Sequence, residues 1–125
     1  GGLSNRVLSK NVINAQDFMA MRDIVDEVYV DDSIYEYVAK IVAKTRDSED
    51  ILQGISPRGS ISIINMAKAE AFLRGHDYVL PSDIQFVLND TMAHRIKRGH
   101  ITEESVIDSI CRSVDVPKIG TRGIL

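Results

Sequence analysis

The sequence is poor in the residues that mark several classes of protein. It has one cysteine, Cys111, no tryptophan and 3 prolines among 125 residues. A single cysteine excludes an internal disulfide, which fits a reducing compartment. No apolar run approaches the ~20 residues that a membrane-spanning helix needs, and no signal-peptide pattern opens the chain. We therefore expect a cytoplasmic protein with no membrane partner.

An excess of positive charge is also missing. The chain has 15 lysines and arginines against 18 aspartates and glutamates, a net charge of −3, with both signs interspersed. Proteins that bind nucleic acids usually carry a basic stripe or patch. A small DNA-binding domain would have to use the cluster Lys97-Arg98-Gly99-His100 as its phosphate contact. The acidic balance disfavours that alternative, and we expect no nucleic-acid partner.

The sequence shows no complete catalytic or metal-binding pattern. The three histidines, His76, His94 and His100, lack paired spacing, so no metal site is predicted. The segment 54–59 has too few glycines for a phosphate-binding loop, and no Gly-Lys-Ser or Gly-Lys-Thr follows it. We therefore predict no catalytic residue, and we expect that the chain alone does not hydrolyse a nucleotide.

What the sequence does contain is helical periodicity, over a length that suits one domain. Caps and apolar spacing predict helices that begin after Asn14, at Ser33, after Ser56, at Pro81 and after Thr102. Their expected ranges are 15–27, 33–45, 57–74, 81–96 and 103–116. Two short pieces, 28–30 and 78–80, favour extended backbone. The predicted fold class is all-α, a compact bundle of four or five helices with at most two very short extended segments.

The central helix, residues 57–74, has the clearest boundaries. Ser56 suits the N-cap, Pro57 suits the first helical position, and Gly75 suits the left-handed position after the last turn. Apolar residues cover most of its circumference, which predicts a helix buried between neighbours. These residues are Ile61, Ile63, Ile64, Met66, Ala67, Ala69, Ala71, Phe72 and Leu73.

Arg58 is the residue that does not suit its place in this helix. A cation in the first turn faces the positive end of the helix dipole, which costs about 0.3–1 kcal/mol at an exposed site. One interpretation is that Arg58 points into water or pairs with the acidic loop of Asp47, Glu49 and Asp50. The other is that an anion binds there, to the guanidinium and to free N–H groups. Residue chemistry leaves both open and makes the first the more common.

Four motifs, in a fixed order, resemble one known family. They are Val28-Tyr-Val-Asp-Asp-Ser-Ile-Tyr-Glu-Tyr-Val, Thr45-Arg-Asp, Gly54-Ile-Ser-Pro-Arg-Gly-Ser and Leu73-Arg-Gly-His-Asp-Tyr-Val-Leu-Pro-Ser-Asp-Ile. Together they resemble the C-terminal helical lid of MoxR-family AAA+ ATPases. The resemblance covers roughly residues 12–117. It leaves 1–11 as a linker or tail, with Gly1-Gly2 a candidate cloning remnant, and 118–125 as a C-terminal tail.

The resemblance implies roles for three residues. Arg58 becomes the sensor-2 arginine, which reaches the phosphates of ATP bound with Mg²⁺ to a preceding core domain. Ser56 and Pro57 set the start of the sensor-2 helix and so position it. Leu80 departs from the family, which commonly has a capping threonine there, and this places the cap of the next helix in question.

The resemblance also implies a function and partners. The parent would be a chaperone-like remodelling or maturation ATPase, whose lid couples nucleotide state to movement. Its partners would be its own core domain, neighbouring subunits of a hexamer and, in some cases, von Willebrand factor A domain proteins. Walker A and Walker B motifs are absent from these residues, so this chain alone would be inactive. The alternative is a helical protein-interaction module without a nucleotide role.

Overall fold

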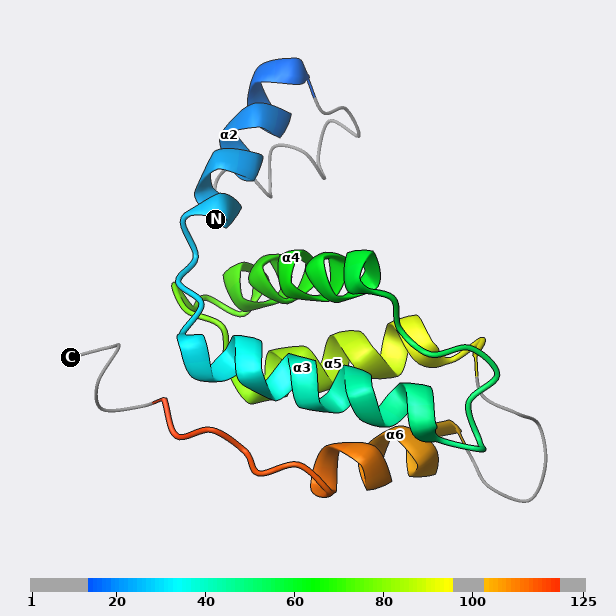
Figure 1. Ribbon diagram of the computed structural model, residues 1–125. Coiled ribbons are helices and arrows are strands. Elements are labelled where there is room, and N and C mark those ends of the chain that lie inside the picture. Colours follow the sequence, from blue (N-terminus) through cyan, green and yellow to red (C-terminus); the bar gives the residue numbers. More distant parts are fainter. Residues whose placement is uncertain (1–13, 96–102, 120–125) are drawn as a thin grey trace.

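The computed structural model describes residues 14–95 and 103–119. These residues form the helices α2 (Ala15–Asp26), α3 (Asp32–Asp47), α4 (Pro57–Leu73), α5 (Pro81–Met92) and α6 (Glu103–Arg112). The helices α3 to α6 pack together, and α2 rises from one end of this bundle (Figure 1). The predicted all-α class is confirmed. None of the helices within the described ranges is long and apolar enough to cross a bilayer.

The two predicted extended segments meet each other. Tyr29 and Tyr78 form an isolated parallel bridge, in which the Tyr29 N–H donates to the Asp77 carbonyl at 2.8 Å. The Val79 N–H donates in turn to the Tyr29 carbonyl at 2.9 Å. This bridge ties the connection between α2 and α3 to the connection between α4 and α5. It therefore fixes the point from which α2 leaves the bundle.

The cap of α2 agrees with the sequence-based expectation, and the cap of α3 differs from it. The Asn14 side chain accepts the Asp17 N–H, as expected for the cap of α2. The predicted helix start at Ser33 is wrong, because Asp31 is the N-cap of α3 and accepts the Ser33 N–H at 3.0 Å. A carboxylate two residues earlier satisfies the same orphan N–H groups, so the helix begins at Asp32.

Both later helices are shorter than predicted. α5 ends at Met92, and α6 ends at Arg112, well before Pro117. The chain after α6 continues without regular secondary structure and carries Val114 and Ile119 into the core. The packed region therefore continues beyond residue 117, where a tail was expected to begin. Thr102, the predicted cap of α6, and residues 120–125 lie outside the described residues.

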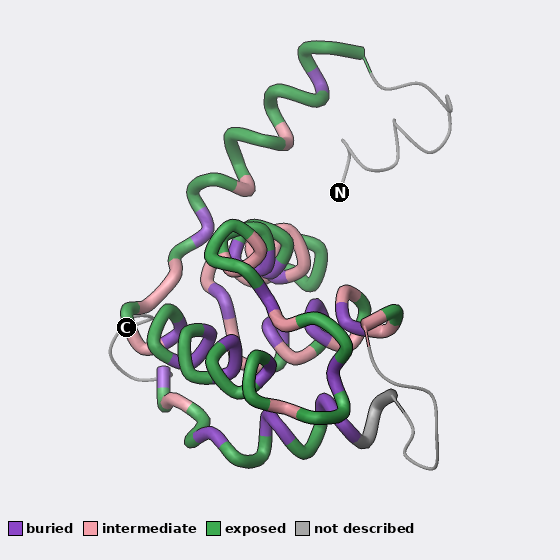
Figure 2. The backbone as a smooth tube through the Cα atoms, turned by 45° about the vertical axis from the view of Figure 1, so that its right-hand side comes forward, coloured by how far each residue is buried: buried purple, intermediate pink, exposed green. Residues whose placement is uncertain are grey.

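The core lies between α3, α4, α5 and α6, where buried positions face inward (Figure 2). Tyr37 of α3 is nearly inaccessible, and its hydroxyl accepts a hydrogen bond from Gln85 Nε2 of α5 at 3.0 Å. Burial raises the pKa of the Tyr37 phenol. It likewise raises the pKa of the Cys111 thiol of α6. Both groups are therefore held in their neutral forms inside the bundle.

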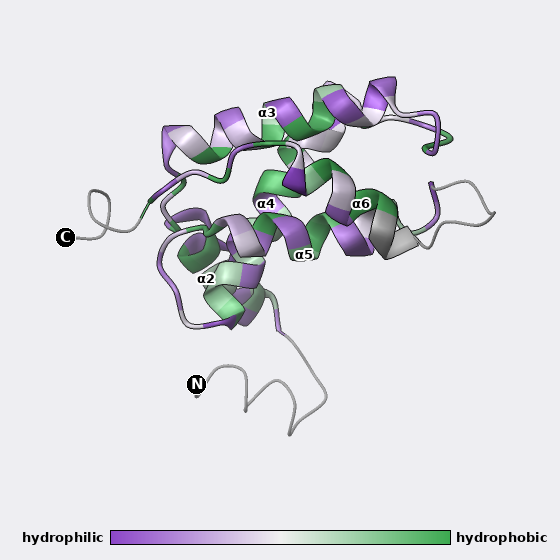
Figure 3. Cartoon of the chain, turned by 90° about the horizontal axis from the view of Figure 1, so that it is seen from below, coloured by the Kyte–Doolittle hydropathy of each residue, from purple (hydrophilic) through white to green (hydrophobic). Residues whose placement is uncertain are grey.

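The expectation that α4 is buried between neighbours holds for only one side of the helix. Only Ile63, Ile64, Ala67 and Ala71 of this helix are buried. Ile61, Met66 and Leu73 are exposed by 64%, 38% and 71%. The bundle covers one side of α4, and α2 reaches only part of the other side (Figure 1). Apolar residues thus occur on the outer side of α4 and on α2, which projects from the bundle, as well as in the core (Figure 3).

Candidate functional site

The start of α4 is capped as the sequence predicts. The Ser56 hydroxyl oxygen accepts the Gly59 N–H at 3.0 Å, and Pro57 is the first helical residue. The Ser60 hydroxyl donates to the Ser56 carbonyl at 3.2 Å. A cap of this kind satisfies backbone groups that have no partner inside the helix. The first turn of α4, and with it the backbone of Arg58, therefore has a defined position.

The end of α3 holds the residue before the cap. Ile55 is buried, and its N–H donates to the Thr45 hydroxyl at 3.2 Å. The Arg46 Nε donates to the Ile55 carbonyl at 3.0 Å. Gly54 lies so close that a Cβ there would meet the Arg46 backbone Cα at 2.9 Å. These two hydrogen bonds, to the carbonyl and from the N–H of Ile55, hold the helix start against α3, and we call them the clamp.

Thr45 and Arg46 are positioning residues that the sequence reasoning did not assign. They belong to a motif quoted for the resemblance, but no role followed from it. Their partner Ile55 lies nine or ten residues further along a polar loop. Side-chain to backbone hydrogen bonds over such a span follow no periodicity, so sequence patterns do not reveal them. The available signal was the Thr-Arg pair at a helix end, followed by Gly54 just before the predicted cap.

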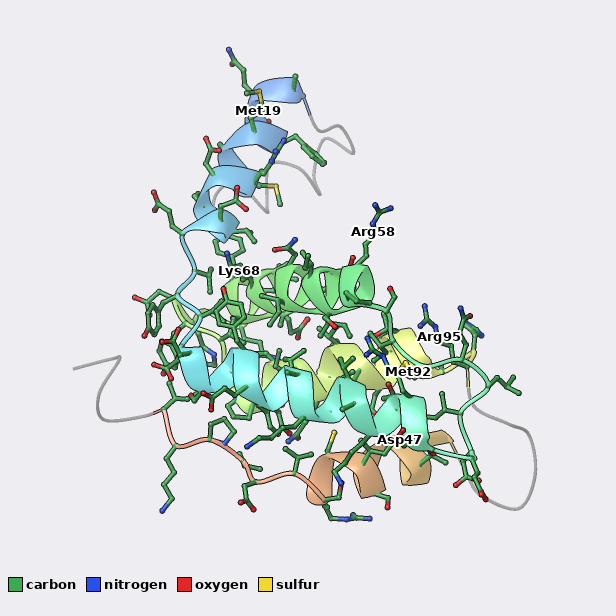
Figure 4. All side chains as sticks on the ribbon, in the orientation of Figure 1. Met19, Asp47, Arg58, Lys68, Met92 and Arg95 are labelled. Atoms are coloured by element: carbon green, nitrogen blue, oxygen red, sulfur yellow. The ribbon has the colours of Figure 1, made fainter. Side chains whose placement is uncertain are left out.

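Arg58 itself is exposed and extends away from the bundle, on the side from which α2 rises (Figure 4). Within the described residues it makes no ion pair, and the carboxylates of Asp47, Glu49 and Asp50 do not neutralise it. Of the interpretation in which Arg58 points into water or pairs with the acidic loop, the exposed placement is found, and the pairing is absent within residues 14–95 and 103–119. An exposed cation on a capped helix start, at the positive end of the dipole, is suited to bind an anion.

The opposite end of α4 carries an arginine in a different setting. Arg74 Nε lies 2.8 Å from Glu70 Oε1, and Nη1 lies 3.8 Å from Asp83 Oδ1. Its guanidinium carbon lies 5.1 Å from the centroid of the Phe86 ring. These contacts join the end of α4 to the start of α5. Arg74 is therefore engaged within the fold.

Asp83 replaces the cap that Leu80 cannot provide for α5. A leucine side chain has no acceptor, so it cannot cap α5 as a threonine would. The carboxylate of Asp83, three residues later, accepts the Leu80 N–H at 2.8 Å. Asp83 is fully buried, and its other carboxylate oxygen lies 3.8 Å from Arg74 Nη1. The start of α5 is thus held by half of a capping box.

The histidines form no cluster in the part of the chain that the structure describes. His76 stacks on Tyr78 with the ring centroids 5.6 Å apart, and His94 is exposed after the end of α5. No group of three metal-ligating side chains occurs among the described residues. His100 lies outside them. The start of α4 therefore remains the candidate site with the most specific geometry.

Comparison with known proteins assigns this arrangement to a family. The sequence pattern of the AAA lid domain matches residues 43–112, which include the end of α3, the clamp and the helices α4 to α6. The chain belongs to the AAA lid domain family. The predicted resemblance to the lid of MoxR-type AAA+ ATPases is confirmed, because proteins of that name are among its relatives.

Two curated relatives and one solved structure show the extent of the similarity. YeaC of Bacillus subtilis, an uncharacterized protein, is 40% identical over 112 residues, which are 85% of this chain and 35% of YeaC. The chaperone MoxR1 of Mycobacterium tuberculosis is 29% identical over 126 residues, covering 89% of this chain and 33% of MoxR1. The structure of a putative ATPase from Cytophaga hutchinsonii has a TM-score of 0.70 and 31% identity, over 82% of this chain and 36% of that one. This lid domain thus spans about a third of the length of these relatives.

Proposed function

We propose that this AAA lid domain acts as the sensor-2 lid of a MoxR-type ATPase, with Arg58 as the residue that contacts the phosphates of ATP. The observation that carries the proposal is the unpaired guanidinium of Arg58 at the capped and clamped start of α4. A guanidinium fork binds phosphate oxygens bidentately, and a nearby phosphate would turn an unfavourable dipole interaction into a favourable one.

The hydrogen bonds to Ile55 would couple a phosphate contact at Arg58 to the rest of the lid. Thr45 and Arg46 fasten the helix start to α3, and α3 packs in the core of the bundle. A force on Arg58 would therefore act on the bundle as a whole rather than on one loop. ATP, held with Mg²⁺ by a separate core domain, would favour the lid orientation in which Arg58 reaches its phosphates. A ligand shifts a conformational equilibrium only through such differential contacts.

The wider role follows from the relatives and belongs to the same proposal. One relative is named a chaperone and a solved relative is described as a putative ATPase. We infer a cytoplasmic, chaperone-like remodelling or maturation ATPase. Its lid would work against its own core domain and against neighbouring subunits of a hexamer. Proteins with a von Willebrand factor A domain are the candidate partners. Without Walker motifs in this lid domain, hydrolysis would depend on the core domain.

The decisive test substitutes Arg58 in the ATPase that carries this lid. Arg58→Ala should lower the rate of ATP hydrolysis at low ATP by about 10- to 100-fold, the value of one or two charge-assisted hydrogen bonds. Arg58→Lys should recover only part of it, since an ammonium lacks the planar fork. Arg112→Ala, at an exposed position on α6, is the matched control.

Two further readouts make the result interpretable. The thermal midpoint of the Arg58→Ala lid should equal that of the wild type, because Arg58 makes no ion pair within the described residues. Unchanged hydrolysis and unchanged ATP affinity in a folded Arg58→Ala protein would refute the phosphate contact. That result would instead favour a helical protein-interaction module.

A further inference from the structure

The guanidinium of Arg46 is only partly used by the clamp. Its Nε donates to the Ile55 carbonyl at 3.0 Å. A guanidinium carries five N–H donors, and the other four of Arg46 belong to its terminal amino groups. Arg46 is exposed, and within residues 14–95 and 103–119 these amino groups have no acceptor. The clamp thus fixes one edge of the guanidinium and leaves the opposite edge available to a ligand.

The charge of Arg46 is also not neutralised by its neighbours. The acidic loop 47–50 follows it directly, yet the two ion pairs found in the described part of the chain belong to Arg74. The helix dipole favours a cation in the last turn of α3, and Lys44 satisfies that preference equally well. The dipole therefore explains a positive charge at this place. It does not explain why the guanidinium is fixed on the approach to the next helix.

Two contacts direct Arg46 toward the start of α4. The stem of the side chain lies against Gly54, where an added Cβ would approach Arg46 Cγ to 2.8 Å. The tip is held by Ile55, the residue directly before the N-cap Ser56. Arg58 follows three residues after Ile55, in the first turn of α4. The clamp therefore places a second guanidinium beside the helix start that carries Arg58.

Two guanidinium groups without ion-pair partners in the described residues thus lie at one helix N-terminus. They repel each other and the positive end of the helix dipole. An anion with charge on several groups reverses the sign of both interactions, since each guanidinium can bind its own oxygens. A polyphosphate has this distribution of charge, whereas a single carboxylate does not. The pair is therefore better suited to a chain of phosphates than either arginine alone.

We propose that Arg46 is a second phosphate-binding residue of the lid, which contacts the polyphosphate of ATP together with Arg58. The inference rests on the proposed function of Arg58 and adds to it a residue from another helix. Arg46 holds the start of α4 through Nε and donates to phosphate oxygens through Nη1 and Nη2. The phosphates then act on α3 directly as well as through α4.

Two substitutions separate the clamp from the charge. In Arg46→Gln the amide nitrogen takes the position of Nε, so the hydrogen bond to the Ile55 carbonyl is kept while the charge is lost. In Arg46→Lys a methylene takes that position, so the charge is kept while the hydrogen bond is lost. The two variants therefore have opposite expected effects on ligand binding and on stability.

The test measures the Kd of the ATPase that carries this lid for a slowly hydrolysed ATP analogue with Mg²⁺, and the thermal midpoint of the lid. Arg46→Gln should raise Kd about tenfold, the value of a charge-assisted hydrogen bond, with little change in the midpoint. The increase should shrink as the salt concentration rises. Arg46→Lys should lower the midpoint and retain most of the affinity. Lys44→Gln, which removes an exposed charge from the same helix, is the matched control and should leave Kd unchanged.

Each outcome supports or overturns the second contact. A Kd that rises in Arg46→Gln but not in Lys44→Gln supports it. Equal increases in these two variants, or an increase only in Arg46→Lys, would overturn it, and so would an unchanged Kd in Arg46→Gln. If Arg58→Ala nevertheless raised Kd, the phosphate contact of Arg58 would stand and Arg46 would serve the clamp alone. If Arg58→Ala also left Kd unchanged, the proposed function would fail as well.

Discussion

Arg58 and Arg74 lie at opposite ends of α4 and have opposite surroundings. Arg74 contacts Glu70, the buried Asp83 and the ring of Phe86, and it sits where the helix dipole favours a cation. Arg58 sits where the dipole disfavours a cation, and it has no ion pair within residues 14–95 and 103–119. Arg74, which has ion-pair partners within the fold, thus stabilises the structure. Arg58, which has none within the described residues, is suited to bind a ligand.

The largest expected effect on stability comes from Asp83, at the satisfied end. Asp83→Ala should lower the free energy of unfolding by about 2–3 kcal/mol, because it removes the hydrogen bond to the Leu80 N–H and the buried carboxylate that pairs with Arg74. Urea denaturation would measure the change. Asp90→Ala, at an exposed position on the same helix, should stay within about 0.5 kcal/mol. Equal effects of the two would contradict the capping role.

A smaller effect is expected at the opposite end of α4. Ser56→Ala should lower the free energy of unfolding by about 1 kcal/mol, because the Gly59 N–H loses its acceptor. In the ATPase it should also lower hydrolysis, since the first turn that positions Arg58 would loosen. Ser62→Ala, exposed in the same helix, is the control and should be neutral or slightly stabilising. If Ser56→Ala left the free energy of unfolding unchanged, the clamp on Ile55 would be sufficient to fix the helix start without the cap.

The two arginines should then respond in opposite ways. Arg74→Ala should lower the free energy of unfolding by about 0.5–1 kcal/mol, the value of a partly exposed ion pair with a ring contact. Arg58→Ala should change it by less than about 0.5 kcal/mol. Parallel denaturation of both variants measures the difference. If Arg58→Ala proved the more destabilising, Arg58 would be a structural residue and the contrast would fail.

The smallest expected effect on stability at neutral pH comes from Cys111, in the core against which α4 packs. Burial raises the pKa of Cys111, so the folded state favours the neutral thiol. Its stabilising contribution is complete below the unfolded thiol pKa of about 8.5 and is lost as the pH rises further. Urea denaturation from pH 7 to 10 should show this loss, and Cys111→Ala should make the decline shallower. In that variant part of the decline should remain near pH 10, because the pKa of Tyr37 is also raised in the folded state. An identical decline in the variant would contradict the assignment.

Much of the fold could be predicted because caps and periodicity are local. Asn14, Ser56, Pro57 and Gly75 act where the sequence placed them, and Gly75 adopts a φ of 85°. One error arose because Asp31 and Ser33 can both cap a helix and Asp31 is the one that does. The others concern the ends of α5 and α6, which tertiary packing decides. The uncovered face of α4 was also missed. Periodicity reports which residues are apolar, but it does not report whether a neighbour is present to cover them.

The sequence by itself determined the helical class, the family resemblance and the place of Arg58 in the first turn of α4, because each depends on residues near one another in the chain. Only the tertiary structure decided that Arg58 is unpaired and Arg74 is paired, since the partners of Arg74 come from two helices. It also decided that Thr45 and Arg46 hold Ile55, and that the bundle covers only one side of α4. Such contacts depend on how distant segments pack, which local patterns do not encode.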